Sequence, residues 1–403
     1  MSDKPVRLAY FVTHPIQYQA PLLRRIAADP SIELTVFFAT GFSLKQHYDP
    51  GFGRSIAWDI DLLSGYDHEF LPVLGDDTKL SPLRPFNYGI VARLLRGRFD
   101  AVWCHSYARP PHLTALVVGR LLGMKVFLRD EASFVSSRPG PMKRFVKMRF
   151  LDCMKAVLSG ILCIGTMNRE YYRAVGFRPE KLFSMPYAVD NEWFQARIAE
   201  AAARREEFRA ELGLEPGRPI ALFAAKFIPR KRAQDLIRAF KAIADRPEAR
   251  RPYLLIAGDG EMGDALHALA GDDDAIRFLG FRGQTELPPL YDICDVFAIP
   301  SDTEPWGLVT NEVMNAARPV IATTEVGAAR DLVRDGENGF VIEPGDIDTL
   351  SDALLKIFSD PEASARMGRR SREIIDGWGF RQDVEGLKAA LRHYFGDRIP
   401  GDT

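Results

Sequence analysis

The chain has 403 residues, of which 46% are hydrophobic and 27% charged, so it can bury the cores of about two domains. Its formal net charge of −1 argues against a nucleic-acid partner, because nucleic-acid-binding proteins usually carry a marked positive surplus. The four cysteines lie far apart without a Cys-x-x-Cys pair, so the sequence predicts neither a disulfide framework nor a zinc site.

The N-terminal segment, residues 1–7, leads directly into a predicted strand and lacks the apolar core of a signal peptide. A run of about 18 apolar residues, as a membrane-spanning helix needs, does not occur. The closest candidate, residues 112–128, is interrupted by Arg120 and Lys125. We therefore expect a cytoplasmic protein without a membrane span.

Short apolar runs alternate with helical patterns, which is typical of parallel sheets joined by crossover helices. In the first half of the chain the predicted strands are residues 8–12, 34–39, 101–105, 125–128 and 161–164. In the second half they are residues 220–224, 253–257, 276–279, 296–299 and 320–323. The sequence thus predicts an α/β protein with two Rossmann-like, doubly wound domains that face one another across a cleft, since such sheets bind ligands beyond the carboxyl ends of their strands.

The boundary between the two domains is predicted near residues 187–217, where a charged helical stretch ends in the turn at residues 215–218. We expect residues 1–187 to form the N-terminal domain and residues 188–379 the C-terminal domain.

In the N-terminal half, polar side chains follow three predicted strands, at residues 13–18, at His105 and at residues 129–131. Because the carboxyl ends of parallel strands meet at one edge of a sheet, these side chains could contact a substrate. A structural role is the alternative, especially for the histidines, since a lone histidine is more often structural than catalytic. The candidates are His14, Gln17, Tyr18, His105, Arg129 and Glu131.

A basic loop at residues 225–232 directly follows the predicted strand at 220–224. Its cations, Lys226 and Lys231 above all, could neutralise a diphosphate that becomes more negative as its bond to a sugar breaks. A solvated basic loop is the alternative interpretation.

The pattern Gly258-Asp-Gly-Glu-Met-Gly263 follows a strand and opens a helix, as a dinucleotide-binding fingerprint does. It falls late in the chain, however, and no acidic residue ends a strand about 20 positions further on. We interpret it as a glycine-rich turn beside another nucleotide, with a purely structural turn as the alternative.

The segment Glu304-Pro-Trp-Gly-Leu-Val-Thr-Asn-Glu312 places two carboxylates eight positions apart across a predicted helix start. A strand precedes it, Gly307 allows the tight turn, and the apolar run at residues 313–317 is expected to continue the helix. Free N–H groups at a helix start attract an anion such as a diphosphate, and the carboxylates can accept hydrogen bonds from sugar hydroxyls. This combination indicates a nucleotide-sugar.

Taken in order, these motifs resemble the C-terminal half of family-four retaining glycosyltransferases of GT-B fold. The matching residues are Lys226 to Lys231, Gly258-Asp-Gly260, Phe278-Leu-Gly280, Pro300-Ser301, Glu304-Pro-Trp-Gly307, Glu312, Pro319-Val-Ile-Ala322 and Asn338-Gly339. The resemblance covers nearly the whole chain and implies that residues 188–379 bind a nucleotide diphosphate sugar. It also implies that residues 1–187, joined by a C-terminal helix at about 380–403, form the acceptor side.

The resemblance further implies that Glu304 contacts sugar hydroxyls, that Glu312 holds the ribose and that His105 contacts the donor sugar near its reacting carbon. His105, Glu304 and Lys231 are therefore the expected catalytic residues, with neither a metal nor a cofactor. The expected donor-binding residues are Lys226, Arg230, Gly258, Gly260, Phe281, Arg282, Gly307, Leu308, Val309 and Glu312. On the acceptor side we expect His14, Gln17, Tyr18, Arg129 and Glu131.

The chain departs from the family pattern at several positions. Residues 13–17 stand where many relatives carry a glycine pair, Lys226 replaces the usual arginine, and Ala317 replaces a frequent glycine. Lysine cannot reproduce a bidentate grip on phosphate.

Read as a helix, residues 142–157 place an apolar stripe of Met142, Val146, Phe150, Cys153 and Val157 beside basic residues. Such a helix could dock peripherally on an anionic membrane to reach a lipid-linked acceptor. An ordinary domain helix with a basic exposed face is the alternative.

The function predicted is transfer of a sugar from a UDP- or GDP-sugar to a glycan, lipid-linked or small-molecule acceptor, with retention, in cell-surface glycan or glycoconjugate synthesis. Two alternatives remain open: a sugar-nucleotide epimerase of the same fold, and a non-catalytic nucleotide-sugar sensor.

Overall fold

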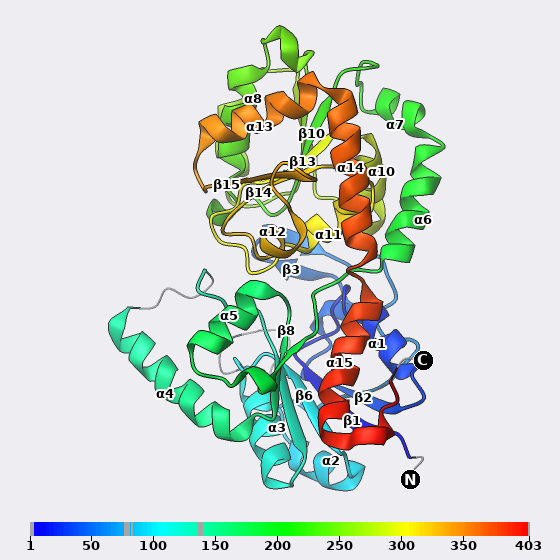
Figure 1. The fold of residues 1–403 in the computed structure, drawn as a ribbon, viewed down its shortest axis with the longest axis vertical. Coiled ribbons are helices and arrows are strands. Elements are labelled where there is room, and N and C mark those ends of the chain that lie inside the picture. Colours follow the sequence, from blue (N-terminus) through cyan, green and yellow to red (C-terminus); the bar gives the residue numbers. More distant parts are fainter. Residues whose placement is uncertain (1–3, 76–80, 82–83, 136–139, 402–403) are drawn as a thin grey trace. The chain divides into compact units, whose positions relative to one another are not determined.

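The computed structural model describes residues 4–75, 81, 84–135 and 140–401. The chain divides into two compact units, drawn in Figure 1: the first contains Met1–His47, Ile60–Tyr187 and Phe380–Thr403, and the second contains Tyr48–Asp59 and Ala188–Gly379. The chain passes from one unit to the other after Tyr187 and returns after Gly379. Residues 48–59, which the sequence assigns to the N-terminal domain, are grouped with the second unit by their contacts; we call them the 48–59 segment.

The first unit is built on a seven-stranded sheet with the order β5-β2-β1-β6-β7-β8-β9, in which all neighbours run parallel. The strand order reverses between β1 and β6, which is the switch point at which such sheets bind ligands. The strands are β1 Val6–Val12, β2 Ile32–Phe38, β5 Asp67–Phe70, β6 Ala101–His105, β7 Lys125–Arg129, β8 Gly160–Cys163 and β9 Leu182–Ser184.

Helices cover this sheet, and the last one comes from the far end of the sequence. That helix, α15 (Phe380–Phe395), packs against β8, β9 and the first helix of the chain. The other helices are α1 Ala20–Ala27, α2 Ile90–Gly97, α3 Pro110–Leu121, α4 Pro141–Val157 and α5 Thr166–Ala174, with the short 3-10 helices η1 Phe42–Leu44, η2 Pro179–Lys181 and η6 Gly396–Arg398.

The second unit contains a six-stranded parallel sheet of order β12-β11-β10-β13-β14-β15, whose switch point lies between β10 and β13. Its strands are β10 Ile220–Ala224, β11 Tyr253–Ala257, β12 Ile276–Gly280, β13 Val296–Ile299, β14 Val320–Thr323 and β15 Gly339–Ile342. A separate two-stranded ribbon, β3 His47–Asp49 with β4 Arg54–Ile56, spans most of the 48–59 segment.

The sheet of the second unit is flanked by helices that alternate with its strands. These are α6 Asn191–Ala202, α7 Arg205–Glu211, α8 Ala233–Ile243, α9 Gly263–Ala270, α10 Leu287–Ile293, α11 Leu308–Met314, α12 Gly327–Leu332, α13 Ile347–Ser359 and α14 Pro361–Asp376, with the 3-10 helices η3 Pro229–Lys231, η4 Pro247–Ala249 and η5 Gln284–Glu286.

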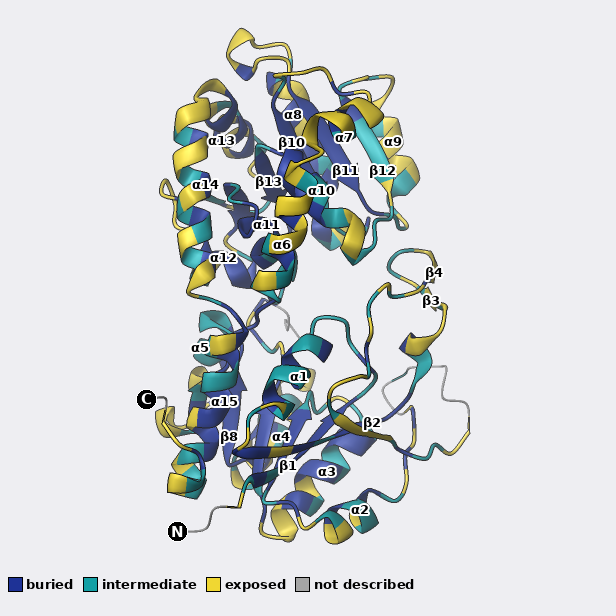
Figure 2. Ribbon diagram, turned by 90° about the vertical axis from the view of Figure 1, so that its right-hand side faces the viewer, coloured by how far each residue is buried: buried dark blue, intermediate teal, exposed yellow. Residues whose placement is uncertain are grey.

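The central strands are buried on both faces, as Figure 2 shows by their dark blue colour. Every residue of β11 and β13 is buried, and the helices α8 and α13 complete the core on one side with side chains such as Phe240 and Leu354. Strands that are buried on both faces need an unbroken apolar sequence, which is why these runs do not alternate with polar residues.

One detail of the helices differs from the prediction. The helix that follows Gly307 ends at Met314 rather than near residue 317, since residues 315–317 form a turn. The buried residues of α4 are Leu151 and Met154, whereas the predicted stripe members Met142 and Cys153 are exposed. Among the described residues, none of the helices combines the length and apolar character needed to span a bilayer.

Candidate functional site

The candidate site of the second unit lies at the carboxyl ends of the adjacent strands β10 and β13. The basic loop leaves β10, and the loop with Glu304 leaves β13 and leads into α11. This is the switch point of the sheet, where two neighbouring loops diverge and leave room for a ligand.

At this point Lys231 and Arg230 converge on the carboxylate of Glu304. Lys231 forms an ion pair with Glu304 Oε2, and both residues are less than a tenth exposed. Arg230 lies 3.4 Å from the same oxygen and donates to the carbonyl of Thr303 at 2.8 Å. Two residues predicted as catalytic, Lys231 and Glu304, are thus in direct contact, and two cations compensate the burial of one carboxylate.

The backbone of Glu304 is fixed by the loop that follows β14. Its N–H donates to the carbonyl of Glu325 at 3.1 Å, and its carbonyl accepts from the N–H of Gly327 at 2.9 Å. A Cβ atom at Gly327 would lie 2.1 Å from the Pro305 carbonyl, so glycine permits this close approach. The position of the Glu304 carboxylate is therefore set by the scaffold rather than by a free loop.

Gly307 makes the turn into α11 with a φ of 93°, a left-handed conformation that favours glycine. Trp306, just before it, is 3% exposed, stacks on Trp378 and donates to Asn311 at 2.9 Å. Leu308 and Val309 form the first turn of the helix, where the sequence placed them. The packing of Trp306 thus holds the turn that orients these backbone N–H groups.

Glu312 is half-buried inside α11 and accepts a 2.5 Å hydrogen bond from the hydroxyl of Tyr291. Burial raises the pKa of Glu312 to about 7, although the Tyr291 hydroxyl opposes this shift. The carboxyl group therefore changes its charge near neutral pH.

The glycine-rich motif packs against the basic loop, backbone to backbone. Gly258 has a φ of 149°, and a Cβ atom there would lie 2.0 Å from the carbonyl of Ala225. Gly260 is similarly confined, but a Cβ atom at Gly263 would meet nothing within 4 Å. A dinucleotide fingerprint uses its third glycine for close helix packing, so the environment of Gly263 differs from that of such a fingerprint.

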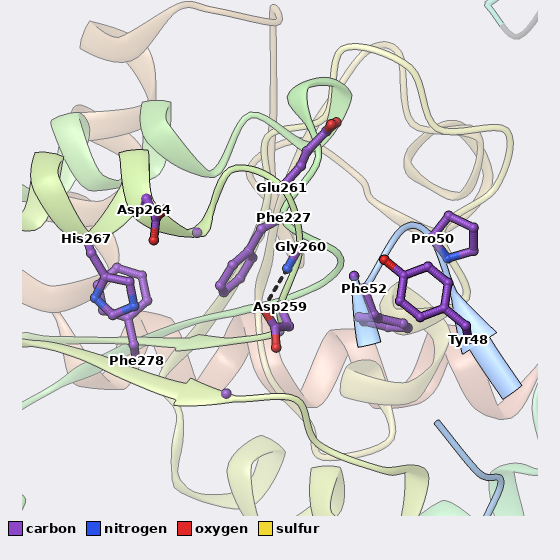
Figure 3. A pocket seen from close by; sticks show the side chains of 14 residues that line it. Tyr48, Pro50, Phe52, Phe227, Asp259, Gly260, Glu261, Asp264, His267 and Phe278 are labelled. Carbon is purple, nitrogen blue, oxygen red and sulfur yellow. Dashed lines mark hydrogen bonds between the residues drawn. The ribbon is translucent and has the colours of Figure 1, made fainter. Parts of the chain in front are cut away.

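Figure 3 shows a pocket of about 590 Å³ between this motif and the 48–59 segment. Its rim combines aromatic rings with carboxylates: Phe278 stacks on His267 with ring centroids 3.8 Å apart, and Asp259 lies opposite Tyr48 and Phe52. A smaller cavity of about 90 Å³ adjoins it and is lined by Phe52, Ala224, Ala225, Ala257, Gly258, Phe281, Arg282 and Leu287. The predicted residues Phe281 and Arg282 thus line a cavity next to Gly258.

Lys226 points to a partner that the sequence did not indicate. Its ammonium donates to both carboxylate oxygens of Asp49, each at 2.8 Å, and lies 4.7 Å from the centroid of the Phe52 ring. Lys226 therefore forms its ion pair with Asp49 of the 48–59 segment and not with Glu304.

In the first unit, His105 ends β6 at the switch point beside β1. The amide nitrogen of Gln19 lies 3.2 Å from its Nδ1, and the hydroxyl of Tyr187 lies 3.3 Å from its Nε2. Burial, with smaller contributions from the charge of Arg129 and from neighbouring histidines, lowers the pKa of His105 to about 3. The imidazole is neutral at physiological pH, so it can exchange hydrogen bonds but carries no charge. The next residue, Ser106, has a φ of 77°, an unfavourable conformation often found at functional sites.

The predicted acceptor-side residues lie in the loops after β1 and β7. His14 Nδ1 and Gln17 Oε1 are buried without a hydrogen-bond partner among the described residues, and burial lowers the pKa of His14 to about 4. The Tyr18 ring lies 5.8 Å from that of Tyr187, and Glu131 is exposed. Unpaired buried polar atoms are costly, so the atoms of His14 and Gln17 offer hydrogen-bonding capacity to a ligand.

Arg129, predicted on the acceptor side, is held by contacts that favour a structural role. Only 1% of the residue is exposed, and its guanidinium donates to the carbonyls of Met185 and Pro186 and to the carboxylate of Asp383. Nearly all of its surface is thus taken up inside the first unit, where it ties β7 to α15 and to the end of β9.

Sequence reasoning missed Gln19, Tyr187, Tyr291 and Asp49, each of which contacts a predicted site residue. Gln19 directly follows the predicted loop 13–18, so its position after the first strand was the available signal. The others lie at sequence separations of 21 to 177 residues from their partners, beyond any local pattern. Within the part of the chain that the structure describes, three or more His, Cys, Asp or Glu side chains do not gather in a metal-binding arrangement.

Part of the chain is similar to known glycosyltransferases. Residues 204–374 match the family described as "Glycosyl transferases group 1". The chain is 34% identical over 207 residues to a D-inositol 3-phosphate glycosyltransferase of Nocardia farcinica, covering 48% of this chain and 46% of that protein. It is 32% identical over 179 residues to the lipopolysaccharide core biosynthesis glycosyltransferase LpsE of Rhizobium meliloti, covering 44% of this chain and 50% of that protein. The match thus spans about half the length of these curated relatives.

The similarity of the fold to solved structures covers more of the chain than the sequence similarity does. The crystal structure of Anabaena HepE in complex with UDP and glucose superposes with a TM-score of 0.68 at 18% identity, covering 96% of this chain and 100% of that chain. The two parallel α/β units therefore have the GT-B glycosyltransferase fold, which confirms the predicted fold class. Residues 204–374 match the group 1 glycosyltransferase family model, which confirms the resemblance noted from the sequence.

Proposed function

We propose that the protein transfers a sugar from a nucleotide diphosphate sugar to an acceptor hydroxyl and retains the anomeric configuration. The observation that carries this proposal is the convergence of Arg230 and Lys231 on Glu304 at the switch point of the second sheet. A carboxylate that is fixed between cations can accept hydrogen bonds from a sugar while the cations attract its diphosphate. The family match over residues 204–374 supports the same donor class.

In this proposal Glu304 binds hydroxyls of the transferred sugar and Glu312 binds the ribose. Arg230 and Lys231, with Lys226, offset the negative charge that grows on the leaving diphosphate. The N–H groups of Gly307, Leu308 and Val309 and the turn at Gly258 and Gly260 also contact the donor, and Phe281 and Arg282 contact its nucleoside end.

The reaction is proposed to occur on one face of the sugar. The bond from the anomeric carbon to the acceptor oxygen forms on the face from which the bond to phosphate breaks, and the acceptor proton passes to the departing phosphate oxygen. The protein's cations supply the charge stabilisation, so the proposal includes neither a metal nor a cofactor.

The first unit is proposed to bind the acceptor through His14, Gln17, Tyr18 and Glu131. His105, neutral at physiological pH, would donate or accept a hydrogen bond to a sugar rather than act as a charged acid. The name of the Rhizobium meliloti relative, a lipopolysaccharide core glycosyltransferase, supports an acceptor in cell-surface glycan synthesis.

We also propose peripheral contact with an anionic membrane through the first turns of α4. Met142, Phe145 and Val146 are at least 60% exposed there, and Lys143 and Arg144 beside them are exposed as well. Exposed apolar and basic side chains on one helix favour an anionic lipid surface. Sedimentation with vesicles of phosphatidylglycerol or of phosphatidylcholine tests this: binding to the former alone supports it, and binding to neither contradicts it.

The donor is tested first by thermal unfolding of the purified protein with UDP-, GDP- and ADP-sugars, because a selective ligand must raise the stability. A stabilising donor is then followed by mass spectrometry with and without a chelator. Stabilisation by one nucleotide class, with slow chelator-insensitive release of free sugar, is the expected result. Conversion to an isomeric nucleotide-sugar would favour the epimerase, and binding without turnover, even with acceptors, would favour the sensor.

A further inference from the structure

The ion pair between Lys226 and Asp49 joins the basic loop to the 48–59 segment. Both carboxylate oxygens of Asp49 accept from the Lys226 ammonium at 2.8 Å. An ammonium has three N–H donors, so Asp49 occupies two of the three. Partial burial raises the pKa of Asp49, but the hydrogen bonds from Lys226 and from backbone amides outweigh this and lower it, so the carboxylate is charged at neutral pH.

The 48–59 segment is held against the second unit at further points along its length. The Phe52 ring packs edge-on against Phe281 with centroids 4.8 Å apart, and Arg54 lies 3.7 Å from the carboxylate of Asp259. At the far end, Asp59 accepts hydrogen bonds from the backbone N–H and the hydroxyl of Thr285 at 3.0 and 2.5 Å. The pair at Lys226 is therefore one of several contacts that hold the segment, and not an isolated surface ion pair.

A diphosphate and Asp49 would compete for the same cation. Among the proposed donor-site cations of the basic loop, Arg230 and Lys231 contact Glu304, whereas Lys226 contacts Asp49. Asp49 thus neutralises Lys226 in the ligand-free protein. A diphosphate that approaches Lys226 must displace the carboxylate or remain close to a like charge, and either event weakens binding.

From this we propose that Asp49 determines how strongly the site selects diphosphate ligands, because it competes with the diphosphate for Lys226. The proposal rests on the function proposed above, in which Lys226 contacts the donor diphosphate. It assigns to the 48–59 segment, which comes from the N-terminal part of the sequence, a role in the nucleotide site of the second unit. A nucleoside without phosphate does not need Lys226, so Asp49 should not affect its binding.

The geometry of the segment supplies a conservative variant. Asp49 Oδ1 also accepts from the N–H groups of Gly51 and Phe52 at 2.8 and 3.2 Å, a turn that asparagine forms equally well. Asp49→Asn therefore keeps the turn and removes the charge. Asp59→Asn is the matched control, since it alters the anchor at Thr285 and leaves the pair at Lys226 in place.

The test is isothermal titration of the wild type and both variants with UDP, GDP and ADP and with the matching nucleosides uridine, guanosine and adenosine. For whichever diphosphate the wild type binds, we expect Asp49→Asn to lower the Kd about three- to tenfold, the range for a half-exposed charged contact. The Kd of the matching nucleoside should be unchanged. Asp59→Asn should change the Kd of the diphosphate by less than about twofold.

Weaker diphosphate binding by Asp49→Asn would overturn the inference, because Asp49 would then position Lys226 rather than compete for it. An equal gain in Asp59→Asn would also overturn it, because loosening of the segment would be the cause. Either result leaves the proposed function standing, provided that the wild type binds a diphosphate. Absence of diphosphate binding in every protein would contradict the proposed function itself and the inference with it.

Discussion

Arg129 at the end of β7 and Asp383 in the first turn of α15 form a buried ion pair with an N–O distance of 3.0 Å. Both side chains are at most 2% exposed. The same guanidinium nitrogen also donates to the carbonyls of Met185 and Pro186, which directly precede Tyr187, the last residue before the chain enters the second unit. The Arg129 guanidinium thus joins the sheet of the first unit, α15 and the start of the connection to the second unit.

Removal of the carboxylate in Asp383→Asn should destabilise the protein by about 3 to 5 kcal/mol, because it leaves a buried guanidinium without its counter-charge. Urea unfolding measures this cost. Arg129→Met combined with Asp383→Leu should recover part of the loss, since no buried charge remains. A double variant as unstable as Asp383→Asn would show that the hydrogen bonds to Met185 and Pro186 matter more than the pair.

The two glutamates of the second unit should affect different kinetic constants. Glu304→Ala should lower kcat about 100-fold or more, because the lost contact acts on the sugar that changes bonding. Glu312→Ala should chiefly raise KM, about tenfold, because the ribose does not react. Steady-state kinetics with the donor identified by thermal unfolding measures both. Asp302→Ala, on the same loop but 40% exposed, is the control, and wild-type activity in both glutamate variants would refute the site assignment.

The pH dependence of stability should contain a contribution from Glu312. Its pKa is raised from 4.5 to about 7 in the folded protein, so the folded state binds this proton more tightly than the unfolded state does. The resulting stabilisation is complete below pH 4.5 and is lost as the pH rises through 7, by up to about 3 kcal/mol. Glu312→Gln lacks this titration. Between pH 5 and pH 8 its free energy of unfolding should therefore rise relative to that of the wild type. A constant difference in urea unfolding would indicate an ordinary pKa for Glu312.

Ala317 adopts a left-handed conformation with a φ of 53° after the end of α11, which costs a residue with a Cβ atom about 1 to 2 kcal/mol. Glycine avoids this strain, but it has more conformational freedom in the unfolded chain. That freedom offsets about 0.5 to 1 kcal/mol of the stabilisation gained. Ala317→Gly should therefore stabilise the protein by about 0.5 to 1 kcal/mol in thermal or urea unfolding. Ala316→Gly is the control: Ala316 is buried without a left-handed φ, so the same change there should be destabilising.

The sequence indicated the central strands well because an unbroken apolar run has few alternatives. The predicted strands 101–105, 220–224 and 253–257 coincide with β6, β10 and β11. In the two large sheets, the strands without a prediction, β5, β9 and β15, all lie at sheet edges, where one neighbour is missing and the sequence need not be apolar throughout. β5, for example, reads Asp67-His-Glu-Phe70 and has three exposed residues.

Within the candidate site, contacts that follow from strand order could be anticipated, and contacts made by distant segments could not. Lys231 and Glu304 meet because their loops leave neighbouring strands, which the doubly wound pattern already implies. Nothing local indicates that Asp49 pairs with Lys226, 177 residues away. The pairing of Arg129 with Asp383, 254 residues away, could not be anticipated for the same reason.

The return of α15 to the first unit has a consequence for synthesis on the ribosome, where a chain emerges from its N-terminus and domains begin to fold as they appear. The strands of the first sheet are all made before residue 188, yet the helix that covers β8 and β9 is made after the whole second unit. In the interval, Arg129 has no Asp383, and the apolar surface beneath α15 is bare. We therefore expect the nascent first unit to keep apolar surface exposed until α15 has left the exit tunnel.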